Sequence, residues 1–200
     1  MQKNSERLKK FYKWWLPVYK LGNKRMCANY RTAMPMLLKQ IDINNKSAIL
    51  DVGTGTGGFA GILLDCTSAR ITGIDFSPEM LNEARKTYGN KINFINLAAH
   101  ELTQFETASF NFVTAAFSLH DMDDEYRLDV LRQMQRVASE KVVIAEWPNK
   151  INPIARFIEF LEGSYYQDFA KHINTQLASV FPKYEEIPFS EELVIYICDV

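Results

Sequence analysis

A glycine-rich stretch early in the chain constrains the fold more than any other feature. Residues 49–60 read ILDVGTGTGGFA, an apolar run followed by closely spaced glycines and then by apolar residues at helical spacing. Such an apolar run is typical of a strand that is buried on both faces. Glycine lets the backbone turn sharply and approach a ligand closely, because it has no Cβ. The stretch therefore predicts a strand, a tight loop and a helix whose first N–H groups point at whatever lies on the loop.

This loop predicts a nucleotide-type pocket but leaves the nucleotide open. Gly53, Gly55 and Gly58 satisfy the G-x-G-x-x-G pattern, so a nicotinamide or flavin site is one alternative and a merely connecting turn is another. Asp51, two positions before the glycines, would repel a pyrophosphate but attract a cationic amino acid group. Asp75 ends the next apolar run, where a carboxylate can accept both hydroxyls of a ribose. Two acids without a phosphate-binding cation suit S-adenosylmethionine, which carries a ribose, a sulfonium and an α-ammonium but no phosphate.

Two segments together resemble a known family. The sequences DVGTGTG at 51–57 and GIDFSPEML at 73–81 resemble the class I S-adenosylmethionine-dependent methyltransferases, above all the small-molecule branch typified by the ubiquinone/menaquinone C-methyltransferases. The resemblance runs from about residue 30 to residue 144. It implies a Rossmann-like three-layer α/β sandwich whose seven-stranded, mostly parallel sheet has the order 3-2-1-4-5-7-6, with the last strand antiparallel. The alternating strand and helix patterns by themselves give only the α/β class.

The resemblance also implies a set of cofactor contacts. Ala98 departs from the family pattern, because relatives usually carry at this position an Asp that bonds the adenine amine. The backbone N–H of the next residue is the contact that stays available to the adenine edge. The expected cofactor residues lie on the glycine loop, at the two acids, after the second acid, and at the ends of the third and fourth strand patterns: Asp51, Gly53, Thr54, Gly55, Gly57, Asp75, Phe76, Met80, Ala99, Phe117 and Ser118.

A histidine follows the fourth strand pattern. His120 lies where the carboxyl end of a parallel strand opens onto a pocket. Its side chain can accept a proton at neutral pH, so we expect it to be the base if the acceptor must lose a proton. The alternative is a histidine that only bonds the following helix.

The N-terminal segment has three interpretations. In the resembled family a Tyr-Asp…Tyr-Asp segment closes over the cofactor here, but this chain combines Tyr12 and Tyr19 with Lys13 and Lys20. A lid would make Tyr19 a second catalytic candidate and Tyr12 a substrate contact. The other interpretations are a helix that packs on the domain edge and a basic, aromatic helix on a membrane surface. Relatives also place substrate contacts near residues 163–168, which makes two more residues substrate candidates: Tyr165 and Tyr166.

Charge is distributed unevenly between the N-terminal segment and the rest of the chain. Residues 1–31 hold nine Lys and Arg against one acid, a net charge of +8, and since the whole chain carries −1 the remainder carries −9. We expect residues 1–28 to form an N-terminal helical lid or cap and residues 29–200 to form the S-adenosylmethionine-binding methyltransferase domain.

Composition argues against several classes of protein. A net charge of −1 argues against a nucleic-acid partner. The three cysteines are widely spaced, and without a C-x-x-C or a His/Cys cluster we expect no metal site and reduced thiols. The chain shows neither a signal-peptide pattern nor an apolar run of membrane-spanning length, so we expect a cytoplasmic protein. The oligomeric state is not legible from the sequence.

The sequence therefore predicts methyl transfer from S-adenosylmethionine to a small-molecule acceptor. Three alternatives stay open: a phospholipid methyltransferase that uses the basic N-terminal segment, a non-catalytic S-adenosylmethionine-binding partner protein, and a nicotinamide-dependent oxidoreductase.

Overall fold

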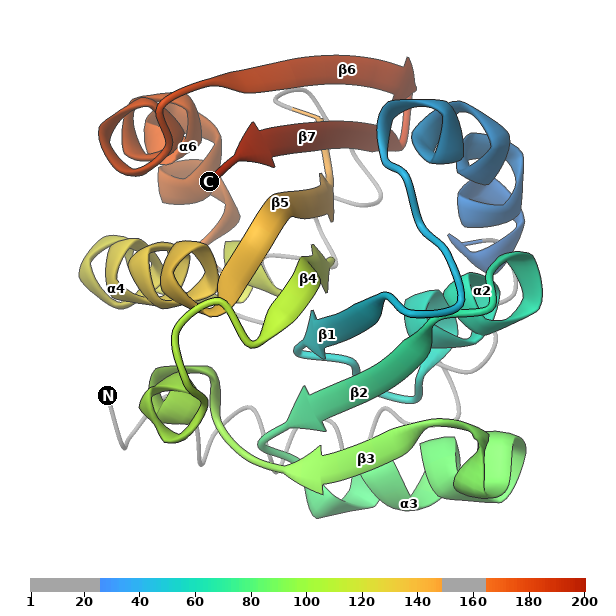
Figure 1. Cartoon of the computed structure of the whole chain (residues 1–200). Coiled ribbons are helices and arrows are strands. Elements are labelled where there is room, and N and C mark those ends of the chain that lie inside the picture. The colour runs from blue at the N-terminus through green and yellow to red at the C-terminus, as the bar shows by residue number, and fades with distance from the viewer. Residues whose placement is uncertain (1–25, 149–164) are drawn as a thin grey trace.

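A computed structural model describes residues 26–148 and 165–200 of the chain, which form one seven-stranded sheet (Figure 1). The strand order is β3-β2-β1-β4-β5-β7-β6. Strands β1 to β5 pair in parallel, and β7 runs antiparallel to both β5 and β6. This confirms the predicted order and the antiparallel last strand. The strands are β1 (Ala48–Val52), β2 (Arg70–Asp75), β3 (Asn93–Asn96), β4 (Phe110–Ala116), β5 (Ala138–Glu146), β6 (Tyr184–Ser190) and β7 (Leu193–Asp199).

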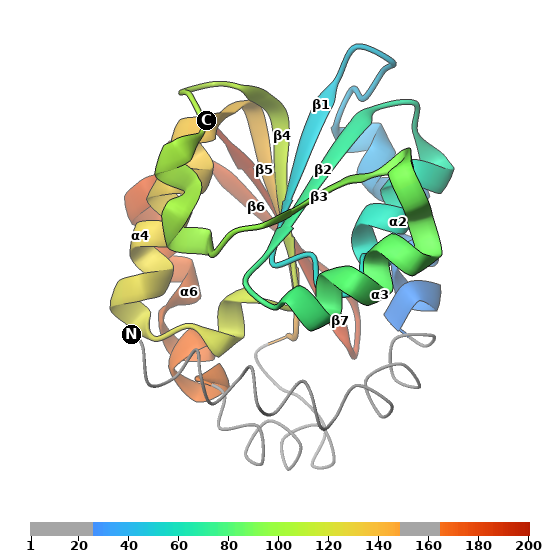
Figure 2. The ribbon, with the colours of Figure 1, turned by 90° about the horizontal axis from the view of Figure 1, so that it is seen from below.

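Helices cover both faces of the sheet, so the predicted three-layer sandwich is confirmed (Figures 1 and 2). On one face lie a helix through residues 26–40, α2 (Gly58–Cys66) and α3 (Pro78–Tyr88). On the other lie α4 (Asp124–Val137) and α6 (Tyr166–Val180). Each face buries its own apolar cluster. Within the described residues lie three short 3-10 helices that the sequence prediction did not include: η1 (Gly89–Lys91), η2 (Ala99–Gln104) and η3 (Leu119–Asp121).

The start of α3 shows how local sequence sets an element boundary. Ser77 is the N-cap, its hydroxyl accepting the N–H of Met80 at 3.3 Å, and Pro78 takes the first helical position. Because β2 ends two residues earlier at Asp75, this cap holds α3 directly behind the carboxyl end of the strand. The sequence predicted this boundary correctly.

The domain division stays a prediction. Residues 1–25 lie outside the described residues, and the expected border between residues 28 and 29 falls within the helix of residues 26–40.

The sheet order places the site. Strand order reverses between β1 and β4, because β2 and β3 lie on one side of β1 while β5 and β7 lie on the other side of β4. In open α/β sheets ligands bind beyond the carboxyl ends of the strands at such a reversal. Val52, Asp75, Ala116 and Glu146 end the strands at this edge.

Candidate functional site

The glycine loop leaves β1 through three left-handed residues. Gly53, Gly55 and Gly57 have φ angles of 69°, 56° and 80°, a conformation that costs residues with a Cβ about 1–2 kcal/mol. A Cβ on Gly53 would lie 2.6 Å from the Cβ of Ser118, so the loop packs directly against the chain that leaves β4. A Cβ on Gly55 would meet no described atom within 4 Å. The loop is thus closed on the β4 side and open at Gly55.

Asp75 fixes the shape of this loop. Its Oδ2 accepts the N–H of Gly55 at 2.9 Å and its Oδ1 accepts the N–H of Ser77 at 2.8 Å. Burial raises the pKa of Asp75 to about 6, and these two N–H donors oppose the rise. Each oxygen of a carboxylate can accept a second hydrogen bond. The geometry leaves Asp75 able to hold the glycine loop and to accept ligand hydroxyls at once.

Asp51 lies deeper and is less well satisfied. Its side chain is 1 % exposed, and its Oδ1 accepts the Thr114 hydroxyl at 2.6 Å. Its Oδ2 has no hydrogen-bond partner among the described residues. Burial raises the pKa of Asp51 to about 6, the Thr114 hydroxyl opposes the rise, and the charge of Asp75 adds to it. A buried carboxylate oxygen without a donor is costly, which indicates that a ligand supplies one.

A pocket opens over Asp51 and part of the glycine loop. It is bounded by the glycine loop, the first turn of α2, the helix of residues 26–40 and the end of β4. None of its described lining residues is Lys or Arg. The lining consists of Met26, Tyr30, Asp51, Gly53, Thr54, Thr56, Gly58, Phe59, Ala116 and Phe117.

The end of β4 forms an aromatic wall. Phe117 has a φ of 50°, unusual for a residue with a side chain, and its N–H donates to the Ala145 carbonyl at 2.9 Å. Its ring centroid lies 5.9 Å from that of Tyr30 and 4.8 Å from that of Trp147. Strained residues of this kind gather at functional sites. The left-handed backbone of Phe117 turns the chain from β4 into the loop that carries Ser118 and His120.

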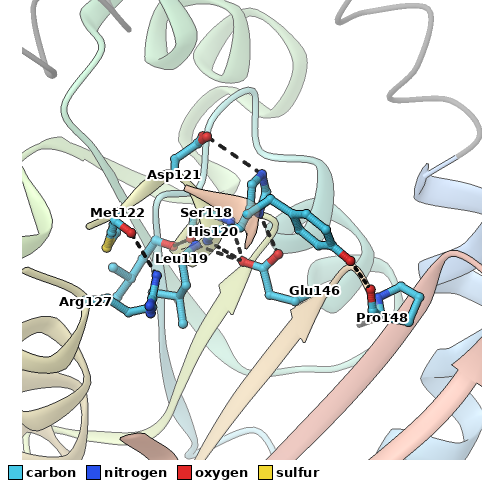
Figure 3. Close-up of polar contacts among 10 residues, drawn as sticks. Ser118, Leu119, His120, Asp121, Met122, Arg127, Glu146 and Pro148 are labelled. Atoms are coloured by element: carbon cyan, nitrogen blue, oxygen red, sulfur yellow. Dashed lines mark hydrogen bonds and ion pairs between the residues drawn. The ribbon is translucent and has the colours of Figure 1, made fainter. Parts of the chain in front are cut away.

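Figure 3 shows a carboxylate on which this loop converges. Glu146 is fully buried, and its Oε1 accepts the N–H groups of Ser118, Leu119 and His120 at 3.0, 2.8 and 3.4 Å. Its Oε2 lies 2.6 Å from Nδ1 of His120, which is 4 % exposed. The Nε2 atom of His120 lies 3.8 Å from Oδ1 of Asp121. The sequence prediction placed Glu146 at the pocket end of the fifth strand but assigned it no role, although an acid at the end of a parallel strand, as at Asp51 and Asp75, is a signal for one.

The expected adenine contacts follow β2 and β3. Phe76 is half-buried directly after Asp75, and Met80 is buried on α3. The N–H of Ala98 donates to Oε2 of Glu101 at 2.9 Å, while Ala99 opens η2 with a half-buried side chain. The structure thus brings these positions to the same sheet edge as the glycine loop.

The tyrosine candidates divide into two groups. Tyr12 and Tyr19 lie outside the described residues. Tyr165 is half-buried before α6. Tyr166 is 7 % exposed, and its hydroxyl donates to the Pro148 carbonyl at 2.5 Å. This hydroxyl is therefore already hydrogen-bonded to the loop after β5. The substrate role of Tyr166 stays a prediction.

The described part of the chain offers neither a metal site nor a membrane span. Residues 26–148 and 165–200 hold no group of three or more His, Cys, Asp or Glu side chains placed to bind a metal ion. Within the same ranges, no helix has the length and apolar character needed to cross a membrane.

Known proteins share this sequence pattern. A family model described as a methyltransferase domain matches residues 49–141. The demethylmenaquinone methyltransferase of Chlorobaculum tepidum is 41 % identical over 86 residues, which cover 43 % of this chain and 35 % of that protein. The enzyme of the same name from Chlorobaculum parvum is 31 % identical over 160 residues, which cover 77 % of this chain and 62 % of that protein. The chain thus spans less than two thirds of the length of these two relatives.

A solved structure shares the fold. An S-adenosylmethionine-dependent methyltransferase from Thermotoga maritima, described as a possible histamine N-methyltransferase, superposes with a TM-score of 0.69 at 14 % identity. The superposition covers 97 % of this chain and 98 % of that one. The family model, the relatives and the sheet order together support a class I S-adenosylmethionine-dependent methyltransferase that resembles the ubiquinone/menaquinone C-methyltransferases.

Proposed function

We propose that the protein transfers the methyl group of S-adenosylmethionine to a small-molecule acceptor. One observation carries the proposal: Asp51 lines a pocket that has no Lys or Arg among its described lining residues, and its buried Oδ2 has no hydrogen-bond partner among the described residues. A pyrophosphate would be repelled there, whereas the α-ammonium of S-adenosylmethionine would supply the missing donor and a positive charge. This argument favours a sulfonium nucleoside over a nicotinamide dinucleotide.

The residues around the pocket fit the rest of the cofactor. Asp75 keeps lone pairs for the ribose hydroxyls, and the open side of Gly55 leaves room for the ligand against the backbone. Phe117 and Ser118 would adjoin the methionine portion. The loop residues Gly53, Thr54 and Gly57 would also contact the cofactor. Phe76, Met80 and Ala99 would flank the adenine.

The protein's part in the reaction is mainly alignment. The bound cofactor supplies the transferable methyl group. Holding the acceptor in line with that methyl and the sulfur can lower the barrier by roughly 7–11 kcal/mol. Where the acceptor loses a proton, His120 would accept it, with Tyr19 as the alternative. Tyr12, Tyr165 and Tyr166 stay candidates for the substrate wall.

Demethylmenaquinone, named in the relatives' descriptions, is the first acceptor to test. Its ring would suit the aromatic wall of Tyr30, Phe117 and Trp147, since aromatic rings pack favourably edge to face. A cytoplasmic location and contact of the basic N-terminal segment with a membrane surface remain predictions from the sequence.

The test has two parts. The protein is incubated with a methyl-labelled donor and a cell extract, and the labelled product is identified. Calorimetry then compares S-adenosylhomocysteine binding in the wild type and in Asp75→Ala, which we expect to lose measurable binding. Asp65→Ala is the matched control, because Asp65 is exposed and ion-paired with Arg31 at 2.8 Å. Wild-type affinity in Asp75→Ala would refute the ribose assignment, and a thermal shift with NADH alone would favour the oxidoreductase alternative.

A further inference from the structure

Glu146, the last residue of β5, also holds the loop that follows β4. Its side chain is fully buried and lies 26 positions beyond the histidine it contacts. A buried carboxylate is destabilising unless donors surround it. Here the donors are three consecutive backbone N–H groups, those of Ser118, Leu119 and His120, together with the imidazole of His120. One side chain therefore fixes both the backbone and the ring orientation of this loop.

The contact also determines which nitrogen of His120 carries the proton. An ionised carboxylate only accepts hydrogen bonds, so Nδ1, 2.6 Å from Oε2 of Glu146, must be the protonated nitrogen. In a neutral imidazole the other nitrogen, Nε2, then keeps its lone pair. A histidine held in this tautomer can accept a proton only at Nε2.

Electrostatics favour that step. A proton taken up at Nε2 would convert the ring to an imidazolium that lies between Glu146, at 2.6 Å from Nδ1, and Asp121, at 3.8 Å from Nε2. Both carboxylates stabilise the cation in surroundings where water is excluded. The rings of Phe117 and Phe169 pack against the imidazole, with centroids 6.4 and 6.5 Å away. The ring is therefore held from four directions.

We infer that Glu146 is a positioning residue, which holds His120 in the Nδ1–H tautomer so that Nε2 can take a proton from the acceptor. This inference rests on the proposed methyl transfer. In the step, the bond from sulfur to methyl breaks and the bond from methyl to acceptor forms. The acceptor proton passes to Nε2, and S-adenosylhomocysteine leaves as the neutral thioether. The proton on Nδ1 stays in place, hydrogen-bonded to Glu146.

The first measurement needs no acceptor and leaves both Glu146 and His120 unchanged. Nitrogen-15 NMR of the histidine-labelled wild-type protein distinguishes protonated from bare ring nitrogens. His120 should show a protonated Nδ1 and a bare Nε2, whereas a free imidazole populates both tautomers. The resonances are assigned with His100→Gln and His172→Gln, which remove the two other histidines of the chain. A protonated Nε2 with a bare Nδ1 would overturn the inference.

The second measurement uses Glu146→Gln. The amide oxygen can still accept the three backbone N–H groups, but the amide NH₂ must donate to Nδ1 and so moves the ring proton to Nε2. We expect a fall in kcat of about 10²–10⁴-fold, the range of general-base catalysis, with unchanged affinity for S-adenosylhomocysteine. Glu140→Gln is the matched control, since Glu140 lies on the same strand but is exposed.

A double-mutant cycle separates positioning from a purely structural role. In a His120→Gln background, Glu146→Gln should cause no further loss of kcat, because the two residues act as a unit. An equal further loss in that background, or an unchanged kcat in the single variant, would overturn the inference. If no acceptor is methylated by the wild-type protein, the proposed function fails, whereas the NMR result still decides the tautomer on its own.

Discussion

Two buried carboxylates flank β4 and differ in one respect. Asp51 near the end of β1 and Glu146 at the end of β5 are 1 % and 0 % exposed. Glu146 meets three backbone N–H groups and an imidazole, whereas Asp51 meets one hydroxyl through Oδ1 and none through Oδ2. The difference separates two uses of a buried charge. A carboxylate that the fold satisfies stabilises the fold, and one left partly unsatisfied costs stability but is ready for a cationic ligand.

The largest effect should come from removing each carboxylate in turn. Glu146→Ala leaves three buried N–H groups without an acceptor, at about 1–3 kcal/mol each before water or relaxation compensates. We expect a loss of stability on the order of 3–5 kcal/mol, or a Tm roughly 10 °C lower, since 1 kcal/mol shifts the Tm of a chain of this size by about 2–4 °C. Asp51→Ala should leave the ligand-free Tm unchanged or higher while it weakens binding of S-adenosylhomocysteine.

Thermal melts followed by circular dichroism, together with calorimetry, test both variants. Equal destabilisation by the two substitutions would break the comparison, because it would mean that Asp51 also supports the fold. Thr114→Val sharpens the comparison between Asp51 and Glu146. That change removes the hydroxyl that donates to Oδ1 of Asp51 at 2.6 Å but keeps the side-chain shape.

A second, smaller contrast lies within the glycine loop. Gly53→Ala adds a Cβ 2.6 Å from that of Ser118, so it should cost about 1–2 kcal/mol for the left-handed backbone and about 1–3 kcal/mol for overpacking. Gly55→Ala meets no described atom within 4 Å and should cost only the backbone strain. Its Cβ would instead occupy the open side of the loop. We therefore expect Gly53→Ala to lower Tm more, and Gly55→Ala to lose ligand affinity out of proportion to its loss of stability.

Thermal melts and calorimetric titrations of the two glycine variants measure both quantities. If the Gly55→Ala variant binds S-adenosylhomocysteine like the wild type, the ligand does not pass over this glycine.

Features that are local in sequence were predicted correctly. The glycine loop, the Ser77 cap and the acid of β2 each depend on residues within one short segment, whose conformational preferences do not need distant partners. The sheet order was predicted through the family resemblance, because strand and helix patterns give only the class.

Features that depend on distant contacts were missed. Glu146 acts through residues 26 to 28 positions earlier, so no spacing rule pairs them. The left-handed Phe117 and the 3-10 helix η3 follow from that convergence rather than from a turn sequence. The sequence placed Ala99 and Met80 near the carboxyl ends of the strands, as the structure does. Their burial, however, is decided by packing against elements elsewhere in the chain.

The effect that we expect to be smallest near neutral pH is a dependence of ligand affinity on pH. In the ligand-free protein burial raises the pKa of both Asp51 and Asp75 from 3.8 to about 6. Between roughly pH 4 and 6 the folded state therefore holds more protons than the unfolded state, so these two groups lower stability as pH rises through that window. The ligand affinity changes with pH in the opposite direction to the stability, because binding needs the ionised forms of both acids. Affinity for S-adenosylhomocysteine should rise with pH and level off above about pH 6.

Below that plateau each protonated acid should cost about tenfold in affinity per pH unit, which is about 1.4 kcal/mol. Asp51→Asn should bind more weakly but with a shallower pH dependence, because only Asp75 still titrates, and its ligand-free Tm at neutral pH should rise as a buried charge is removed. Calorimetric titrations from pH 5 to pH 7.5 measure the slopes directly. A wild-type affinity that stays constant across this range would mean either that both acids are already ionised at pH 5 or that the ligand does not depend on their charges.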